Sequence, residues 1–362
     1  MKAKIKKYWL INNLRETNSQ YNIAYGGRSD GKSYACKHHC AERAVDPMKK
    51  FIYLRRWDLE IKPDAVSDYF KDLDVKRIFG SECEGVVKYG NKLYVTAYDE
   101  TTGRVKRWKH VGYCMSLSAA AHYTGGSYLD VENILYEEFI SRDYYLKDET
   151  TKLQDFVSTI ARDRDVKVWM VGNALTRFCP YFSDWELTKT NKQKQGEIAI
   201  YKIATGRFNE DNEPIYAQVA VEFTEASGTG SKMFFGQKSK MITEGGWQTD
   251  IKPKLERRLE TYRTIYTVVI ICKKFMFLGR YLYDKESSGC FWYIERKTTE
   301  VKPKSRIISD TFSPDPLHTI GFVALSPEER EIFRDIDRRK VVYSDNLTGT
   351  EFIQACRELQ GA

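Results

Sequence analysis

The sequence predicts an α/β protein built from two domains with a small linker region between them. Short apolar segments alternate with helical segments over residues 1–205, polar and Gly-rich stretches interrupt the pattern over residues 206–258, and β-rich runs follow in residues 259–362. Strands that alternate with helices form a mostly parallel sheet with both faces covered. A length of 362 residues fits two or three small domains.

Apolar runs that end at turn residues define the elements of the N-terminal domain. The dipeptides Gly90-Asn91 and Thr102-Gly103 mark the turns of a β-meander. The expected elements, in chain order, are strand Tyr21–Tyr25, helix Lys32–Ala44, strand Phe51–Arg55, meander Val86–Lys109, strand Val111–Leu117, strand Ile134–Tyr136, helix Leu153–Arg162 and strand Val166–Val171. In the linker region that follows, we expect no more regular structure than a short helix or a hairpin.

The C-terminal domain begins with three β-rich runs, and Asp284–Gly289 has the composition of a hairpin turn between the second and the third. Ser326 followed by Pro327 and two acidic residues is typical of a helix start, because Ser caps the helix and Pro suits its first position. The expected elements are strands Thr264–Cys272, Phe275–Tyr283, Cys290–Arg296 and Ile307–Phe312, and helices over 327–339 and Glu351–Leu359.

Charge is the feature of the composition that bears on partners. Lys and Arg number 58 against 50 Asp and Glu, and the segment Ile251–Ser309 alone holds fourteen basic and six acidic residues. A basic, aromatic-rich segment suggests a polyanionic partner, and solvated side chains on an ordinary surface are the alternative. The longest apolar run, Ile265–Cys272, is too short for a membrane span. The eight cysteines form no CxxC pair and no secretory signal is visible, so we expect a reducing cytoplasm.

The strongest motif follows the first expected strand and opens the first expected helix. It matches GxxxxGK[ST] and reads Gly26-Gly27-Arg28-Ser29-Asp30-Gly31-Lys32-Ser33. Glycines let a backbone wrap around phosphates, and a helix N-terminus directs N–H groups at them. We therefore expect ATP to bind here, with Lys32 on the β- and γ-phosphates and the Ser33 hydroxyl on Mg²⁺. A chance match in a loop is the alternative, which the strand–loop–helix context disfavours.

A P-loop needs a carboxylate at the end of a neighbouring strand, and two acids follow the apolar run Ile134–Tyr136. We expect Glu137 to act through the Mg²⁺ shell and Glu138 to polarise the attacking water. Two solvated acids at a strand end are the alternative. Asn173, just past the strand Val166–Val171, is a candidate sensor of the γ-phosphate, and its alternative is a turn-forming Asn.

Arg162 lies at the end of a helix, just ahead of that strand. An arginine supplied by a neighbouring subunit can stabilise the charge of a transition state. A solvated basic residue that suits the helix dipole is the alternative. The residue types alone leave both readings open.

Taken together, these motifs resemble a known family. The resemblance covers about Tyr21 to Phe182 and rests on Gly26–Ser33, Phe51-Ile52-Tyr53-Leu54-Arg55-Arg56, Ile134–Phe139, and Asn173 followed by Pro180-Tyr181-Phe182. The chain is similar to the DNA-packaging ATPases of small podophages that prime replication with a terminal protein, within the large-terminase group of P-loop motors. The resemblance implies an additional-strand (ASCE) ATPase fold and ATP-driven translocation of double-stranded DNA into a procapsid in the host cytoplasm.

The same resemblance implies partners. They are double-stranded DNA, the portal protein and procapsid, and further copies of the chain in a homopentameric ring. A packaging RNA is a further candidate partner, and a membrane is not expected. By matching position, Arg162 is the arginine given in trans. Glu137 departs from the Asp that the family usually has at the metal position.

Large terminases carry an RNase H-like nuclease after the ATPase, and its two metal ions need several carboxylates, the first on the first strand. Here that strand, Thr264–Phe275, has no Asp or Glu and has Lys273 and Lys274 instead. We therefore expect a degenerate RNase H-like α/β domain that does not cut DNA and contacts nucleic acid or the portal through the basic segment Lys252–Arg306. The alternatives are a DNA-cleaving large terminase and a non-motor P-loop protein, such as a nucleotide kinase or signalling switch, whose lid or base-specific motifs we do not find.

Overall fold

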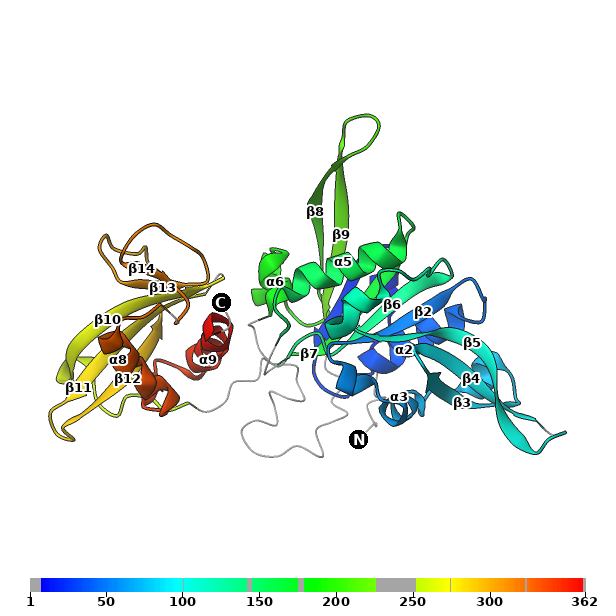
Figure 1. The fold of residues 1–362 in the computed structure, drawn as a ribbon, viewed down its shortest axis with the longest axis horizontal. Helices are drawn as coiled ribbons and strands as arrows, with labels where there is room; N and C mark the ends of the chain where they lie inside the picture. The colour runs from blue at the N-terminus through cyan, green and yellow to red at the C-terminus, as the bar shows by residue number, and fades with distance from the viewer. Residues whose placement is uncertain are drawn as a thin grey trace, which may run out of the picture. The chain divides into compact units, whose positions relative to one another are not determined.

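The chain folds into two compact units (Figure 1). The computed structural model describes residues 8–99, 101–141, 145–174, 179–225, 252–273, 275–322 and 324–360. The first unit holds the described residues up to 225, apart from Cys179, and the second holds those from 252 onward.

A nine-stranded sheet forms the centre of the first unit. Its strands are β1 (Tyr21–Gly26), β2 (Lys50–Arg55), β3 (Cys83–Tyr89), β4 (Lys92–Asp99), β5 (Arg104–Ser116), β6 (Val131–Glu137), β7 (Lys167–Asn173), β8 (Ile198–Phe208) and β9 (Pro214–Phe223). Their order is β3-β4-β5-β2-β6-β7-β1-β9-β8. The strands from β5 to β9 in this order pair in parallel, while β3, β4 and β8 pair antiparallel at the two edges. The mostly parallel sheet predicted from the sequence is confirmed.

Strand β7 lies between β1 and β6, which is the additional strand that the resemblance implies. The register pairs Gly26 with Asn173 and Val171 with Glu137. Because all three strands are parallel, their carboxyl ends meet at one edge of the sheet. This edge is where the sequence motifs converge.

Helices cover both faces of this sheet. They are α1 (Asn12–Glu16), α2 (Lys32–Arg43), α3 (Pro63–Phe70), α4 (Val75–Phe79), α5 (Glu149–Ala161) and α6 (Pro180–Asp184), and 3₁₀ turns span Asp58–Ile61, Leu117–Tyr123 and Thr188–Asn191. One core cluster joins α2, α3 and α4 to the strands through residues such as Cys40, Phe70 and Trp169. Tyr136 points to the other face, on which Figure 1 shows α5. No helix within the described ranges is long and apolar enough to cross a membrane.

Two expectations about this unit need correction, and several of its helices were not predicted. The predicted strand Val111–Leu117 is not a separate element, because β5 continues without a break from Arg104 to Ser116. The sheet does not end near residue 205, because β8 and β9 extend it to Phe223. These two strands form a hairpin that belongs to the first unit, whereas a hairpin was expected within the linker region. Helices α1, α3, α4 and α6 were not predicted.

The second unit is a six-stranded mixed sheet covered by two helices, in agreement with the predicted α/β class. Its elements are β10 (Arg263–Cys272), β11 (Phe275–Asp284), β12 (Gly289–Arg296), β13 (Ile307–Ser309), β14 (His318–Ile320), α8 (Pro327–Asp337), β15 (Val341–Tyr343) and α9 (Asn346–Gln360), with a 3₁₀ turn at Leu259–Thr261. The order is β14-β13-β10-β11-β12-β15. Strands β10, β11 and β12 are antiparallel, and β13 pairs parallel to β10. The short strands β14 and β15 were not predicted.

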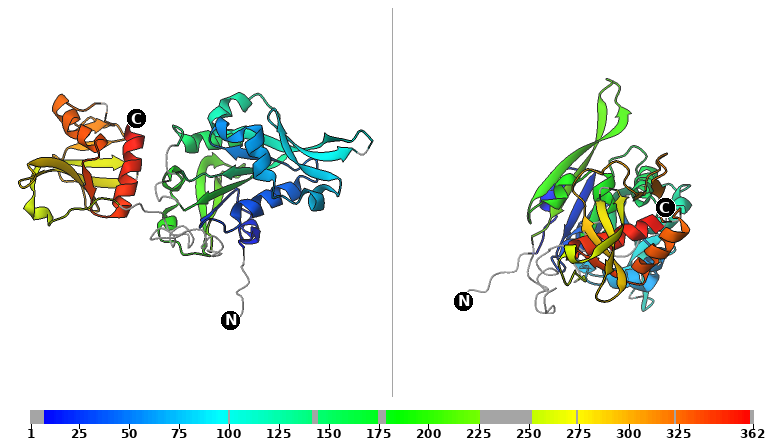
Figure 2. Two further views of the ribbon diagram at one scale, coloured as in Figure 1. Left: turned by 90° about the horizontal axis from the view of Figure 1, so that it is seen from below. Right: turned by 90° about the vertical axis from the view of Figure 1, so that its left-hand side faces the viewer.

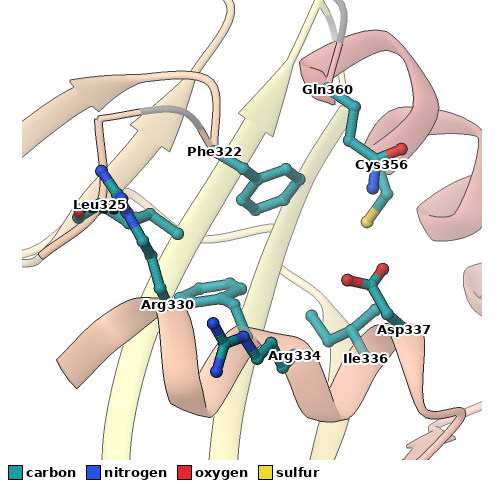
Figure 3. Close-up of a pocket in the computed structure, with 9 residues that line it drawn as sticks. Phe322, Leu325, Arg330, Arg334, Ile336, Asp337, Cys356 and Gln360 are labelled. Carbon is teal, nitrogen blue, oxygen red and sulfur yellow. Dashed lines mark hydrogen bonds between the residues drawn. The ribbon is translucent and has the colours of Figure 1, made fainter. Parts of the chain in front are cut away.

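The start of α8 follows its sequence signal. The Ser326 hydroxyl accepts a hydrogen bond from the Glu329 N–H at 3.2 Å, and the Glu329 carboxylate accepts one from the Ser326 N–H at 3.1 Å. This reciprocal capping satisfies two N–H groups that the first turn leaves unpaired. A hollow of about 280 Å³ opens between α8 and α9, and its apolar lining includes Phe322 and Leu325 as well as Phe333 and Ile336 of α8 (Figure 3).

Glu222 is an acidic residue inside the core of the first unit. It lies on β9 beside Ala24 of β1 and is only 4% exposed. Burial disfavours the charged carboxylate and raises the pKa of Glu222 from an ordinary 4.5 to about 7. Between these two values the folded chain binds more protons than the unfolded chain, so this residue makes stability fall as pH rises.

We expect Glu222→Gln to remove this pH dependence. Relative to the parent, the variant should gain about 3 kcal/mol of unfolding free energy as pH rises from 4.5 to 8, because one pKa unit corresponds to about 1.4 kcal/mol. Urea denaturation at four or five pH values measures the difference. Glu84→Gln, at an exposed position on β3, is the matched control and should track the parent. A constant difference between Glu222→Gln and the parent across this range would contradict the interpretation.

Candidate nucleotide-binding site

The P-loop motif forms the turn between β1 and α2. Gly31 caps α2 with a φ of +89°, a left-handed conformation that glycine adopts without strain. A Cβ on Gly26 would lie 2.1 Å from the Thr224 hydroxyl oxygen, so no side chain fits there. The described backbone therefore has the strand–loop–helix form that directs N–H groups toward phosphates.

Lys32 is buried within this loop. Its ammonium donates a hydrogen bond to the Gly27 carbonyl and lies 3.8 Å from the Asp30 carboxylate. Burial lowers the pKa of Lys32, and the charges of Asp30 and Glu137 oppose that effect. Arg28 and Ser29 are exposed at the turn of the loop. The basic group thus lies against the loop backbone, as a phosphate site requires.

Ser33 and Glu137 come together although 104 positions separate them in the chain. The Ser33 hydroxyl donates to one oxygen of Glu137 at 2.9 Å, and the Tyr69 hydroxyl donates to the other at 2.7 Å. Burial raises the pKa of Glu137, while these two hydrogen bonds favour the ionised form. A hydroxyl beside a carboxylate at a P-loop is a hard oxygen donor set of the kind Mg²⁺ prefers, so these residues fit the predicted ion.

Glu138 has a different environment from its neighbour. Its side chain is 60% exposed and forms an ion pair with Arg55 at 2.8 Å. The same guanidinium contacts Glu60 at 2.7 Å. Glu138 has a φ of +57°, an uncommon conformation for a residue other than glycine. Strained backbone of this kind is often found at functional sites, where the surrounding structure holds it in place.

A buried ion pair provides that support. Arg56 lies 2.8 Å from Glu149, and both side chains are at most 5% exposed. The Arg56 guanidinium also donates to the carbonyls of Glu138 and Phe139 at 3.2 and 2.7 Å. Glu149 in turn accepts hydrogen bonds from the hydroxyls of Tyr136 and Tyr181, both at 2.8 Å. This network ties the turn after β6 to α5 and α6.

Part of this site could not be predicted from the sequence. Glu149 resembles any acid in the first turn of a helix, and Tyr69 lies on a helix that was not predicted. The adjacent basic residues Arg55 and Arg56 at the end of β2 entered the prediction only as part of the family pattern, without a role of their own. Their separate partners became visible only in three dimensions.

Asn173 lies where the sequence predicted. It ends β7 and pairs in register with Gly26, and the N–H of Ala174 donates to the Gly26 carbonyl at 2.8 Å. Asn173 is therefore at the same sheet edge as the P-loop and the acidic pair. Its contact with a γ-phosphate stays a prediction.

Arg162 is not brought to this edge. It follows α5 and precedes β7, so it lies near the start of β7. Strand β7 has seven residues, and at about 3.3 Å per residue its carboxyl end is roughly 20 Å away. Its exposed guanidinium donates to the Gly126 carbonyl at 2.8 Å. Arg164 differs, because it donates to the four carbonyls of Tyr128, Leu129, Val131 and Ile160. Arg164 thus holds the local fold, and Arg162 faces solvent.

Four of the fourteen basic residues in the basic segment of the second unit are paired with acids of that unit. Its arginines form ion pairs between Arg257 and Asp284, Arg280 and Glu295, Arg296 and Glu351, and Arg306 and Glu329, with N···O distances of 2.6, 2.7, 3.2 and 2.6 Å. Two of these acids, Glu329 and Glu351, lie outside the segment in sequence. Of the two lysines that follow β10, Lys273 donates its backbone N–H to the Asp310 carboxylate at 2.8 Å, and Lys274 lies outside the described residues.

Comparison with known proteins links the first unit to one family. The family model described as Podovirus DNA encapsidation protein (Gp16) matches residues 4–204, more than half of the chain. The DNA packaging proteins of Bacillus phages phi29 and B103 are 31% and 30% identical to this chain over 165 residues. These alignments cover 44% of this chain and 45% and 46% of the two relatives. The chain thus spans less than half the length of the curated relatives it matches.

Two solved structures share the fold across 98% of this chain. They are the bacteriophage Phi-29 viral genome packaging motor assembly, with a TM-score of 0.55 and 18% identity, and the Phi-28 gp11 DNA packaging motor, with a TM-score of 0.51 and 16% identity. The matches cover 99% and 98% of those chains. At these identities the likeness concerns the fold alone.

The Arg56–Glu149 pair generates a stability prediction. Glu149→Ala leaves a buried guanidinium without its partner, which typically costs about 3–5 kcal/mol. Glu132→Ala is the matched control, because it removes an acid from a more exposed pair. Glu132 lies 2.7 Å from Arg43, and the two side chains are 27% and 42% exposed, respectively. Pairs exposed to solvent contribute about 0–1 kcal/mol. Urea denaturation should therefore give a much lower midpoint for Glu149→Ala, and equal midpoints for the two variants would refute the assignment.

Proposed function

The chain belongs to the podovirus DNA encapsidation protein (Gp16) family, and from this membership we propose that it hydrolyses ATP to drive double-stranded viral DNA into a procapsid. The observation that carries the proposal is the hydrogen bond between Ser33 and Glu137 beside the P-loop lysine. A phosphate-binding loop, a basic group and a metal-binding carboxylate are the parts that phosphoryl transfer from ATP requires.

Each residue of the site has a separate task in this proposal. The N–H groups at the start of α2 and the Lys32 ammonium bind the β- and γ-phosphates. Ser33 and Glu137 would hold Mg²⁺, which neutralises charge on the phosphates when bound. Lys32 must leave the Gly27 carbonyl to reach a phosphate, so nucleotide binding is expected to replace this internal hydrogen bond.

Glu138 is the proposed acceptor of the proton from the attacking water. Its exposure supports this assignment, because an exposed carboxylate can reach water whereas Glu137 is enclosed. In the ion pair with Arg55 the carboxylate is oriented by the end of β2. Release of Glu138 from Arg55 would then precede proton transfer. Asn173, at the end of the strand between the P-loop and the acids, is the proposed γ-phosphate sensor.

The partners follow from the family. We propose that the chain acts as a homopentameric ring on the portal protein of the procapsid, with a packaging RNA as a further candidate partner. The proposed domain roles are an ATPase domain at residues 1–205, a linker region at 206–258 and a vestigial nuclease-like domain at 259–362. Because β8 and β9 belong to the first sheet, the ATPase domain would extend to Phe223.

The absence of a carboxylate on β10 supports a packaging protein that does not cleave DNA. A two-metal nuclease needs acids on its first strand, and the sequence of β10 is RTIYTVVIIC. The DNA-cleaving alternative therefore lacks its main chemical group. A nucleotide kinase or signalling switch is disfavoured by the family membership.

Two substitutions test the ATPase assignment. Lys32→Ala should weaken both ATP binding and hydrolysis, because the ammonium contacts phosphates. Glu138→Gln should keep ATP binding and lower turnover by about 10²–10⁴-fold, the usual contribution of a general base. Fluorescent-nucleotide binding and phosphate release, each with and without duplex DNA, measure the two effects.

The parent serves as the control in both assays. Its turnover should rise when duplex DNA is added, and plasmid incubated with it and Mn²⁺ should remain uncut. Unchanged turnover in Glu138→Gln would remove that residue as the base, and turnover insensitive to DNA would remove the translocation proposal.

Arg162 is proposed to act in the site of a neighbouring subunit. Its distance from the sheet edge that holds its own P-loop argues against a role in cis, and its exposure leaves it accessible to a second chain. By contrast, Arg164 is engaged by four carbonyls and would be unsuitable.

Mixed rings test this arrangement. Arg162→Ala and Glu138→Gln should each be inactive alone. When they are mixed, some interfaces join an intact Glu138 to a neighbour's intact Arg162, so partial ATPase activity should return. An arginine acting in cis gives no recovery, because neither variant subunit holds a complete site. No recovery under conditions where native mass spectrometry detects mixed rings would rule out the role in trans.

A further inference from the structure

The hairpin of β4 and β5 ends in a ribbon that stands free of the rest of the first unit. Figure 1 and Figure 2 show it extending away from the body of that unit. We call its distal part, residues 98–99 and 101–108, the β4–β5 arm. Five consecutive residues on β5, from Arg104 to Trp108, are exposed. Since successive side chains on a strand point to opposite faces, both faces of this ribbon are open to solvent.

The arm and its base are basic. Residues 88–109 contain six Lys or Arg and two Asp or Glu. One of the acids, Asp99, is already paired with Lys106 at 2.9 Å. Arg104 and Arg107 have no acidic partner among the described residues. In the basic segment of the second unit, four of the six arginines are paired with acids at 2.6–3.2 Å, and only Arg258 and Arg263 have no acidic partner in the described part of the chain.

Large side chains accompany these charges. Tyr98 and Trp108 are each 47% exposed, and Tyr89 at the base of the arm is 64% exposed. The Arg107 guanidinium lies 3.8 Å from the centre of the Tyr89 ring, which holds it in a fixed orientation while leaving its charge uncompensated. Trp108 is the additional residue of a β-bulge, because Lys109 pairs with Val95 and Arg107 with Thr96. Bulges of this kind turn a side chain away from the regular pleat.

We propose that the β4–β5 arm is a nucleic-acid contact that binds the phosphate backbone of a double helix. A two-stranded ribbon fits into the roughly 12 Å wide major groove, and unpaired arginines on both faces would reach phosphates on either side of that groove. Contacts to phosphates are independent of sequence, as a protein that moves along DNA requires. This inference rests on the proposed packaging function.

The other free hairpin of this unit shows that such charge is not a general property of its ribbons. The β8–β9 hairpin also has a long exposed part, but its turn carries Glu210, Asp211 and Glu213. It includes two exposed basic residues, Lys202 and Arg207. It therefore offers a matched control with the same number of removable charges on the same kind of structure.

The test uses the full chain and a 30-base-pair fluorescent DNA duplex without ATP, with affinity measured from 50 to 300 mM salt. Loss of two phosphate contacts in the double variant Arg104→Gln/Arg107→Gln should weaken binding and reduce the slope of log affinity against log salt by about 2. Lys202→Gln/Arg207→Gln should leave the slope as in the parent. ATP hydrolysis without DNA should be the same in all three proteins.

A parallel titration with an RNA duplex separates the two sources of a phosphate backbone. A reduced slope with DNA alone identifies the arm as a contact for the packaged DNA, and a reduced slope with RNA alone identifies a structural RNA as the partner; either supports the proposal. An unchanged slope with both duplexes overturns the proposal. If the slope is unchanged but the double variant alters the mass of the ring, the arm is a contact between subunits and the proposal is likewise overturned. If the parent binds no duplex, the proposed function fails together with the arm.

Discussion

The buried ion pair between Arg56 and Glu149 is the interaction on which the geometry of the site depends. It joins the end of β2 to the start of α5, and the same guanidinium holds the carbonyls of Glu138 and Phe139. A charged pair out of water is stable only when its remaining hydrogen-bonding capacity is filled, and two tyrosine hydroxyls do this for Glu149. The turn that carries Glu138 is thereby fixed, which accounts for its left-handed backbone.

This fixed turn gives two adjacent acids unlike surroundings. Glu137 is the last residue of β6 and points into the buried space beside Ser33 and Tyr69. Glu138 lies past the strand end, is largely exposed, and meets Arg55. One carboxylate is therefore enclosed beside the P-loop, and the other is open to solvent. The Glu137 side chain is long enough to accept a hydrogen bond from the Ser33 hydroxyl at 2.9 Å, which places the carboxylate directly beside the start of α2.

Ion pairing also decides which positive charges remain available to a partner. The C-terminal segment with the largest basic excess contributes four arginines to ion pairs, two of them with acids from α8 and α9. The hairpin of β4 and β5 has a smaller excess, and both arginines of its arm lack acidic partners in the described structure. Charge that remains uncompensated on an exposed ribbon is available to a polyanion, whereas charge neutralised within the fold mainly stabilises its own unit.

Local patterns in the sequence determined much of this protein. The P-loop, the acidic pair, Asn173 and the strands that carry them were predictable, because a strand–loop–helix motif and apolar runs that end at polar residues are encoded by neighbours in the chain. The start of α8 was predictable for the same reason.

Tertiary structure alone decided which distant residues meet. The Tyr69 contact with Glu137 and the Glu149 contact with Arg56 join residues 68 and 93 positions apart, and no local pattern specifies such a partner. The joining of two predicted strands into β5 and the extension of the sheet to Phe223 were likewise decided by pairing with other strands. Net charge could be counted along the chain, but only folding determined which charges were neutralised, since ion pairs form between residues that are close in space.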